Sequence, residues 1–318
     1  MKWAAGILLM AAWITPSDAA APADVAAYQA LAQQDLRLAT IGYRLALANV
    51  PFCDRKTLSP GWVLHDEAQY PDNGLAKTAF VFRSPVAISS VVAGGGAAQL
   101  GLQAGDGITA VDGIDVTGPN IVKNGRATAR VAKIQTLLEA AFAKTGTAVV
   151  SMKTAAGPKQ VKLQPSAICS SQFWVDTKTK LDAGADGVSV RVTQGLMTFA
   201  AADDAELAAV VAHEMAHNLL RHRDRLVATG GAKKQVLTTE IEADRLSVWL
   251  MQNAGYDPAA AVRFIERFGR KTSLGIFPDG SHLRWRNRQM LMQAEIVGMM
   301  QVDARNGLRS PPLLRLSN

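Results

Sequence analysis

The amino-acid sequence predicts an α+β protein in which a mainly helical domain is interrupted by a glycine-rich β module. Two observations support this. Leu and Ala recur at helical spacing towards both ends of the chain, whereas alternating strand patterns and glycine turns occupy the middle, from about residue 78. With 318 residues, 48% hydrophobic and 19% charged, the chain has the composition of a globular protein and room for two domains.

Residues 1–21 have the pattern of a secretory signal peptide. One Lys precedes an apolar run of about ten residues, followed by a TPSD turn and small residues suited to cleavage between Ala19 and Ala21. A membrane anchor is the alternative, but this run is shorter than the ~20 residues of a bilayer span, and no spanning run follows. We therefore expect an exported, periplasmic protein without a transmembrane segment in the mature chain.

The formal net charge is +7, from 34 basic and 27 acidic residues. The basic residues are scattered, being densest in RHRDR and RWRNR, and aromatic residues are not interleaved with them. This distribution predicts weak attraction to anionic surfaces and no nucleic-acid binding.

Cys53 and Cys169 are the two cysteines of the chain. In an oxidising compartment a disulfide between them is the default. In the chain-entropy model, closing a loop of about 116 residues stabilises a fold by roughly 4–5 kcal/mol. Two free buried thiols are the alternative.

The first expected element is a long amphipathic helix over residues 21–50, with Asp24 as a candidate cap. Residues 50–62 contain two prolines and a glycine, which predict a loop. The β module follows, and its expected elements are a strand in 79–92, a glycine-rich segment with a strand in 93–116, a helix in 127–144, and a hairpin in 147–165 that turns at Gly157 and Pro158.

Residues 96–116, GAAQLGLQAGDGITAVDGIDV, resemble the signature of bacterial PDZ domains. They contain a short helix at 97–101, a Gly-Asp turn at 105–106 and a strand that ends in an Asp-Gly hairpin at 112–113. The resemblance implies a module that binds an extended peptide C-terminus by strand addition, with backbone amides around the carboxylate. Asn73–Lys77 is only a loose candidate for that carboxylate loop, and a purely structural β module is the alternative.

Helical patterns return after Pro165. The expected elements are a strand in 187–199, a helix from Asp203 to about Arg225 with its N-cap in DDAE, a helix from Thr238 or Thr239 to Gly255, and a helix with Asp257 as N-cap and Pro258 in its first turn.

The segment VVAHEMAHNLLRHR, residues 210–223, contains an HExxH motif. His213 and His217 lie one turn apart on one helix face, so both imidazoles can point at a single metal ion. Glu214 lies beside this face, where it can act as a general base towards a zinc-activated water. By chance the motif is expected only roughly 0.002 times in such a chain. An ordinary structural helix is the alternative.

A catalytic zinc normally has three protein ligands and one open position. In TTEIEADR, Glu240 and Asp244 share a helix face, whereas Glu242 points away from it. We therefore expect Glu240 as the third ligand and Asp244 as the group that accepts the free N–H of a ligand imidazole. His222, five residues after His217, is rotated off the metal face and is expected on the surface or behind the ligands.

From residue 187 to about residue 288 the sequence resembles family forty-eight of the zinc metallopeptidases, which includes HtpX, BepA and the CAAX prenyl proteases. VRVTQGLM resembles the family's edge strand beside the active site, DDAELAAVVAHEMAHNLLRH its metal helix, and EIEAD its ExxxD motif. The resemblance implies a gluzincin fold with one Zn²⁺ per chain and endoproteolysis of extended peptides. It assigns His213, His217 and Glu240 to the metal, Glu214 to the base, and Asp244 to ligand orientation.

Family members often carry a His-Pro pair followed by an Arg six residues after the His. SHLRWRNR supplies His282 and Arg288 at this separation, with Leu283 in place of the proline. Either side chain can stabilise the oxyanion of the transition state. A cationic helix start on the surface is the alternative.

The resemblance also implies a domain order. Residues 1–21 form the signal peptide, 22–77 the first part of the peptidase, 78–166 an inserted PDZ-like domain and 167–318 the remaining metallopeptidase domain. A disulfide between Cys53 and Cys169 would clasp the base of this insertion.

The sequence therefore predicts a zinc endopeptidase of the cell envelope that acts on unfolded or extended proteins in quality control, with the PDZ-like domain gating or presenting substrate. A latent zinc protein that works as a chaperone or PDZ peptide-binding module is the alternative, and a plug such as His282 would indicate latency. A pure PDZ adaptor leaves Glu240 and Asp244 without a role.

Overall fold

The computed structural model describes residues 25–118, 129–272 and 285–314. The expected signal peptide and His282 lie outside these residues. Two hydrophobic cores are present. One lies in the β module, within residues 62–163, and the other joins α1 and residues 173–314 with Val92, Ile168 and the two cysteines of the disulfide. The predicted α+β class, a mainly helical domain with a small sheet and a separate β module, is confirmed.

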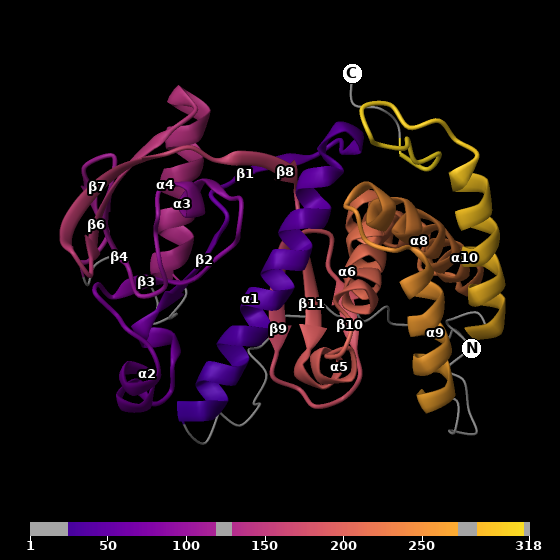
Figure 1. The fold of residues 1–318 in the computed structure, drawn as a ribbon, viewed down its shortest axis with the longest axis horizontal. Coiled ribbons are helices and arrows are strands. Elements are labelled where there is room, and N and C mark those ends of the chain that lie inside the picture. Colours follow the sequence, from indigo (N-terminus) through magenta and orange to yellow (C-terminus); the bar gives the residue numbers. More distant parts are fainter. Residues whose placement is uncertain (1–24, 119–128, 273–284, 315–318) are drawn as a thin grey trace, which may run out of the picture.

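The N-terminal helix α1 (Val25–Ala48) lies between the β module and the rest of the helical part (Figure 1). Leu38, Ile41 and Leu45 are buried along one side of it. Gly42 lets the helix approach the sheet closely, because a Cβ at this position would lie 2.4 Å from the ring of Phe173. The predicted long helix is confirmed, and its glycine is explained by this contact.

A two-stranded ribbon joins the β module to the helical part. β1 (Lys56–Ser59) pairs antiparallel with β8 (Ser166–Cys169), and a disulfide links Cys53 to Cys169 beside it, with Cα atoms 5.6 Å apart. The sequence predicts a loop over residues 50–62, which is wrong for β1. The pairing partner lies over a hundred residues away, so no local pattern reveals this strand.

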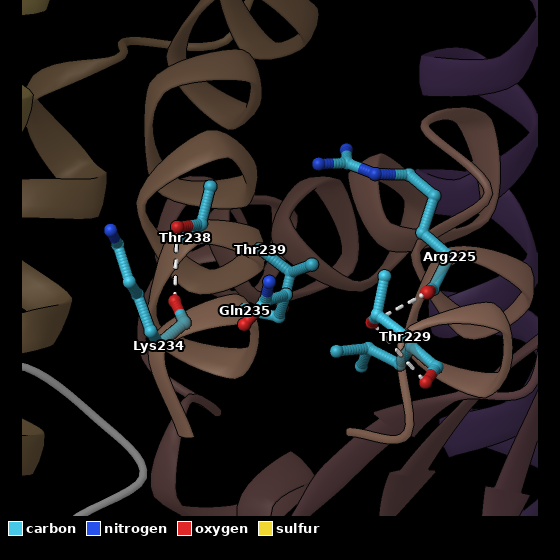
Figure 2. A pocket seen from close by; sticks show the side chains of 7 residues that line it. Arg225, Thr229, Lys234, Gln235, Thr238 and Thr239 are labelled. Carbon is cyan, nitrogen blue, oxygen red and sulfur yellow. Dashed lines mark hydrogen bonds between the residues drawn. The ribbon is translucent and has the colours of Figure 1, made fainter. Parts of the chain in front are cut away.

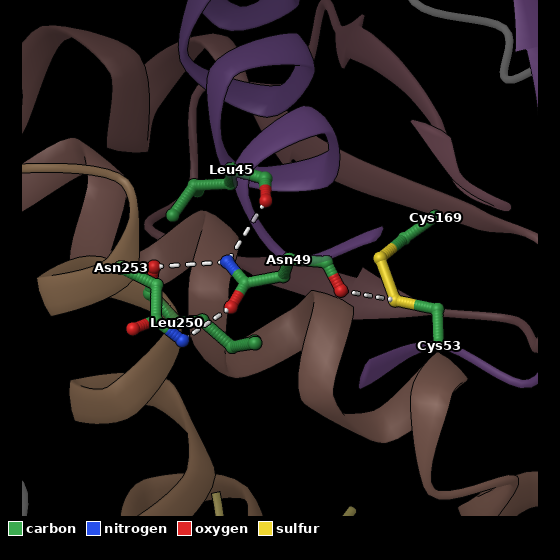
Figure 3. Close-up of a disulfide and its surroundings, with 6 residues drawn as sticks. All are labelled: Leu45, Asn49, Cys53, Cys169, Leu250 and Asn253. Atoms are coloured by element: carbon green, nitrogen blue, oxygen red, sulfur yellow. Dashed lines mark hydrogen bonds between the residues drawn. A yellow bond between two sulfur atoms is a disulfide. The ribbon is translucent and has the colours of Figure 1, made fainter. Parts of the chain in front are cut away.

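Asn49 connects the end of α1 to the helical part beside the disulfide (Figure 3). It is fully buried, and its side-chain amide donates to the carbonyls of Leu45 and Leu250. Its own side-chain oxygen accepts a hydrogen bond from Asn253. A buried amide with both ends bonded holds this junction in one geometry.

The β module is built on a six-stranded sheet. The strand order is β2-β3-β4-β6-β7, and β5 pairs with β4. The strands are β2 (Trp62–Asp66), β3 (Val86–Val91), β4 (Gly107–Val111), β5 (Ile114–Asp115), β6 (Ala148–Thr154) and β7 (Gly157–Leu163). Helix α4 (Ala129–Thr145) packs on the sheet, and the short helix α3 (Gly96–Gln99) lies near the predicted one.

Four local features of the β module can be compared with what the sequence predicts for them. The Asp-Gly hairpin is confirmed, with φ +47° at Asp112 and +78° at Gly113 between β4 and β5, as a type I′ turn requires. The β6–β7 turn falls two residues early, because Thr154 pairs with Gly157. Residues 73–77 lie in helix α2 (Asn73–Ala79) and form no carboxylate loop. Strand β2 precedes residue 78, where the sequence places the start of the PDZ-like domain.

The small sheet of the helical part contains β9 (Gln172–Asp176), β10 (Ala183–Ala185) and β11 (Ser189–Thr193) in the order β10-β11-β9. β11 is therefore central, paired with β9 in parallel and β10 antiparallel, and the expectation that VRVTQGLM is an edge strand is wrong. The strand also ends at Thr193, whose hydroxyl caps helix α5 (Gln194–Phe199).

The remaining helices are α6 (Asp204–Leu219), α7 (His222–Ala228), α8 (Lys233–Asn253), α9 (Ala259–Thr272) and α10 (Trp285–Met300). The single helix predicted to Arg225 is interrupted at Arg221, which adopts a left-handed conformation with φ +54°. The start of α8 at Thr238 or Thr239 is also wrong. Both hydroxyls donate to carbonyls within α8, and Gly230 and Gly231, with positive φ, make the turn before it.

Candidate active site

Helices α6 and α8 pack against each other and bring the predicted metal ligands together. The Nε2 atoms of His213 and His217 are 3.2 Å apart. Glu240 on α8 contacts each histidine with a different carboxylate oxygen. Its Oε2 atom lies 3.4 Å from Nε2 of His213, and its Oε1 atom lies 3.6 Å from Nε2 of His217. These three residues form a candidate metal site in which all ligand atoms lie within 4.8 Å of one another.

The separations between these atoms fit a tetrahedral zinc ion. Bonds of about 2.05 Å at the tetrahedral angle place neighbouring ligand atoms about 3.3 Å apart. The two imidazole nitrogens are 3.2 Å apart, and each lies 3.4 or 3.6 Å from a different oxygen of Glu240, so every nearest separation is close to this value. Two imidazoles and one carboxylate also form the donor set of catalytic zinc sites, which leave a fourth position open. The residues present therefore fit the metal that the motif predicts.

The charges around the site favour a cation. His213 is largely buried, which opposes its protonation, yet the carboxylates of Asp244 and Glu240 raise its pKa to about 10. A group whose positive form is favoured despite burial reports a negative local potential. The same potential would favour a divalent metal ion held by the Nε2 atoms of the two histidines.

Asp244 lies behind His213, one helical turn after Glu240. Its Oδ1 atom is 3.0 Å from Nδ1 of His213, the ring nitrogen that faces away from the metal site. Arg288 from α10 binds the same carboxylate through two nitrogens, at 2.6 and 2.8 Å. Asp244 is fully buried, and the Arg288 charge, opposing the effect of burial, holds its pKa below the usual range.

His217 is supported by a second chain of contacts. Nδ1 of His222 lies 3.0 Å from Nδ1 of His217, and Nε2 of His222 lies 3.0 Å from a Glu242 carboxylate oxygen. Arg225 binds that oxygen at 2.6 Å. Burial lowers the pKa of His222 to about 4, so the ring is neutral near pH 7. It can then donate from Nε2 to Glu242 and accept from His217 at Nδ1.

Of the two positions that the sequence allows for His222, on the surface or behind the ligands, the structure shows the second. The rotation of His222 off the metal face assumes one continuous helix, but the break at Arg221 turns α7 and returns His222 to a position behind His217. His222 is only 1% exposed. Glu242 does point away from the metal, as predicted, and its partner is the imidazole that supports the ligand. The sequence alone does not reveal this role of Glu242, because it depends on the helix break at Arg221.

Glu214 follows His213 directly on α6. Burial raises the pKa of its carboxyl group above the usual range, with the charge of His213 opposing this effect. Within the described part of the chain, its carboxylate makes no hydrogen bond or ion pair. It is therefore available to exchange a proton in a site of reduced solvation.

The residues predicted for the oxyanion are only partly placed. Arg288 is largely buried, and its bidentate contact with Asp244 gives it a positioning role in the structure. It is also close enough to Glu214 and Glu240 for their charges to favour its protonated form. His282 lies outside the described residues.

A separate hollow of about 280 Å³ lies between α7 and the start of α8 (Figure 2). Its hydroxyl groups are already engaged, because Thr229 donates to the carbonyl of Arg225 and Thr238 to that of Lys234. The three candidate metal ligands do not line it. This hollow is therefore separate from the candidate metal site.

The fold combines a candidate metal site between two helices with a separate β module. Residues 171–239 match the model of peptidase family M48, and residues 69–129 match that of the PDZ domain. Over the residues that they cover, these matches confirm both resemblances, to an M48 metallopeptidase and to a PDZ domain. The match implies a zinc-dependent protease and a peptide-binding module. No curated protein matches the chain.

The matched segment ends at residue 239, one position before Glu240. The assignment of Glu240 as a candidate third metal ligand therefore rests on its distances to the two histidines.

Proposed function

We propose that the protein is a zinc-dependent endopeptidase of the cell envelope that cleaves unfolded or extended polypeptides. The observation that carries this proposal is the separation of the His213, His217 and Glu240 donor atoms, which matches one tetrahedral Zn²⁺ per chain. Beside them lies the carboxylate of Glu214, which makes no hydrogen bond or ion pair with any residue that the structure describes. A structural zinc site has no use for a free carboxylate next to a ligand.

When bound, zinc supplies a Lewis acid that polarises the scissile carbonyl and makes water more acidic. The protein's own groups handle the protons. Glu214, with its raised pKa, accepts a proton from water and then donates it to the leaving amine. Asp244 and His222 hold the imidazoles of His213 and His217 in the orientations that leave both Nε2 atoms free for the metal.

An extended substrate can add to the small sheet at β10. This strand is at the edge of the β10-β11-β9 sheet and contacts α6, the helix that carries His213. An unpaired strand edge offers backbone donors and acceptors to an incoming peptide in any sequence. This supports cleavage of unfolded chains rather than of one short motif.

We propose the periplasm as the compartment. A structural disulfide such as Cys53–Cys169 is typical of proteins in oxidising compartments. Among the residues that the structure describes, no helix is long and apolar enough to cross a membrane. The signal-peptide pattern in residues 1–21 agrees with export.

The function is tested with the purified mature chain and its Glu214→Gln variant, using casein as an unfolded substrate and measuring zinc in both. We expect about one zinc in each protein and cleavage by the wild type alone, because the variant keeps the ligands and loses the base. If both bind zinc and neither cleaves, the endopeptidase proposal is wrong and a latent or binding role takes its place.

A further inference from the structure

A cleft of about 290 Å³ lies where the β module meets the helical part. Strand β2 and helix α4 form two of its walls. The third wall belongs to the helical part and includes Tyr43 of α1 and Phe173 and Trp174 of β9. The cleft is therefore shared between the two parts of the molecule.

Strand β2 can accept another strand in this cleft. It is the last strand in the order β2-β3-β4-β6-β7, so its outer edge has no partner strand among the described residues. Helix α4 is held against β2 by a buried ion pair, in which Nε of Arg130 lies 2.8 Å from Oδ2 of Asp66. An extended segment between β2 and α4 gains backbone hydrogen bonds from the strand and apolar contacts from the helix.

The entrance of β2 lacks a cradle for a carboxylate. Such a cradle needs successive free backbone amides. Of the residues that precede β2, Pro60 has no N–H, and the amide of Gly61 donates to the hydroxyl of Ser59. Ser59 itself is paired with Ser166 in the β1–β8 ribbon. The backbone of these three residues therefore offers no set of successive free N–H groups to a carboxylate.

The charge of the cleft also disfavours a C-terminal carboxylate. Among the described residues that line it, Glu139 on α4 is the one charged side chain, and no Lys or Arg is present. A carboxylate in this cleft would lose its hydration without gaining a cation, whereas a basic side chain of a ligand gains Glu139.

The cleft continues past the start of β2 to Ser171 and Trp174 of the helical part. Ser171 is buried, and its hydroxyl has no hydrogen-bond partner within the described ranges. A polypeptide that passes beyond β2 therefore meets apolar surface and a free hydroxyl group instead of a closed end.

We infer that this cleft binds an internal segment of an extended polypeptide, neutral or basic in charge, as an added strand along β2, and that it does not read a free C-terminus. The inference rests on the proposed function in one respect, that the bound polypeptide is the substrate of the peptidase. The β module would then retain any unfolded region of a substrate, wherever its chain ends.

The test measures binding of fluorescent β-casein to the full mature chain carrying Glu214→Gln, by anisotropy. One casein has a free C-terminus, and the other is fused through its C-terminus to a folded domain whose own C-terminus is buried in its fold. We expect the two to bind equally. Gln135→Trp, which fills the cleft from an exposed position on α4, should weaken binding of both about tenfold, or about 1.4 kcal/mol.

Thr136→Trp is the matched control, because Thr136 is the exposed neighbour of Gln135 on α4 and does not line the cleft. Loss of binding on fusion, equal effects of the two tryptophans, or no casein binding overturns the inference. The outcome is separable from the proposed function. A protein that binds as expected but never cleaves keeps this inference and loses the function. If Gln135→Trp is introduced into the chain that retains Glu214 and casein is cleaved as fast as by the wild type, the proposed function stands and this inference fails.

Discussion

His222 holds its Nδ1 atom 3.0 Å from Nδ1 of His217, so the imidazole of one candidate metal ligand is supported by a second, fully buried imidazole. Glu242 and Arg225 complete this chain on the far side of His222. The two ligand histidines are therefore oriented differently, His213 by a carboxylate and His217 by a neutral ring. A neutral acceptor supports the ligand without adding negative charge beside the metal.

We expect His222→Phe to weaken zinc binding, because His217 loses the acceptor that fixes its orientation. Loss of such a partner typically lowers metal affinity about 10- to 100-fold. Competition with a chromophoric chelator measures this directly, without an activity assay. Arg223→Ala, an exposed neighbour on α7, serves as the control. Equal zinc affinity in all three proteins would show that the His222 contact has no positioning role.

Arg288 could act in two ways, and each predicts a different effect of its substitution on zinc affinity and kcat. If it holds Asp244, Arg288→Gln should lower zinc affinity and stability together, because the buried Asp244 carboxylate loses its arginine partner, at a cost of about 3–5 kcal/mol. If it acts only on the oxyanion, kcat falls while zinc affinity stays constant. From its bidentate contact we expect the first result, read from chelator competition and urea unfolding.

Reduction of the Cys53–Cys169 disulfide should destabilise the protein. In the chain-entropy model, a bridge across this separation contributes about 4–5 kcal/mol. Urea unfolding with and without a reductant measures the difference in the free energy of unfolding. The Cys53→Ser, Cys169→Ser double variant should be as stable as the reduced wild type, and the reductant should not change its stability. Identical unfolding midpoints for oxidised and reduced wild type would contradict the expectation.

Stability should fall at acidic pH through His65 of β2. Burial lowers the pKa of His65 to about 4, below its ordinary value of 6.5, so the folded state resists protonation. The unfolded chain takes up the proton first. The contribution of His65 is therefore complete above about pH 6.5 and is lost as the pH falls towards 4, by roughly 3 kcal/mol at most.

The His65→Phe variant isolates this effect. Urea unfolding at pH 7.5 and pH 4.5 should show a smaller loss of stability in the variant than in the wild type. His65 stacks on Phe82, so an aromatic replacement keeps the packing while removing the titrating group. An equal loss in both proteins would assign the pH dependence to other residues.

Local sequence patterns determined the elements whose signals lie within one or two turns of chain. The spacing of His213 and His217 placed two imidazoles on one face of α6, and the Asp-Gly pair at 112–113 defined a hairpin. Glu240 and Asp244 were predicted to share a face because they are four residues apart, and the structure brings both to His213. In each case the backbone geometry of one element is sufficient.

Tertiary structure decided the features that depend on a distant partner. β1 exists because β8 pairs with it, and β11 is central because β9 and β10 flank it. The left-handed turn at Arg221 returns His222 to the metal site, and Asp244 captures Arg288 from α10. Such contacts join residues far apart in the chain or across a break in a helix, and their energies depend on packing and burial that no local pattern contains.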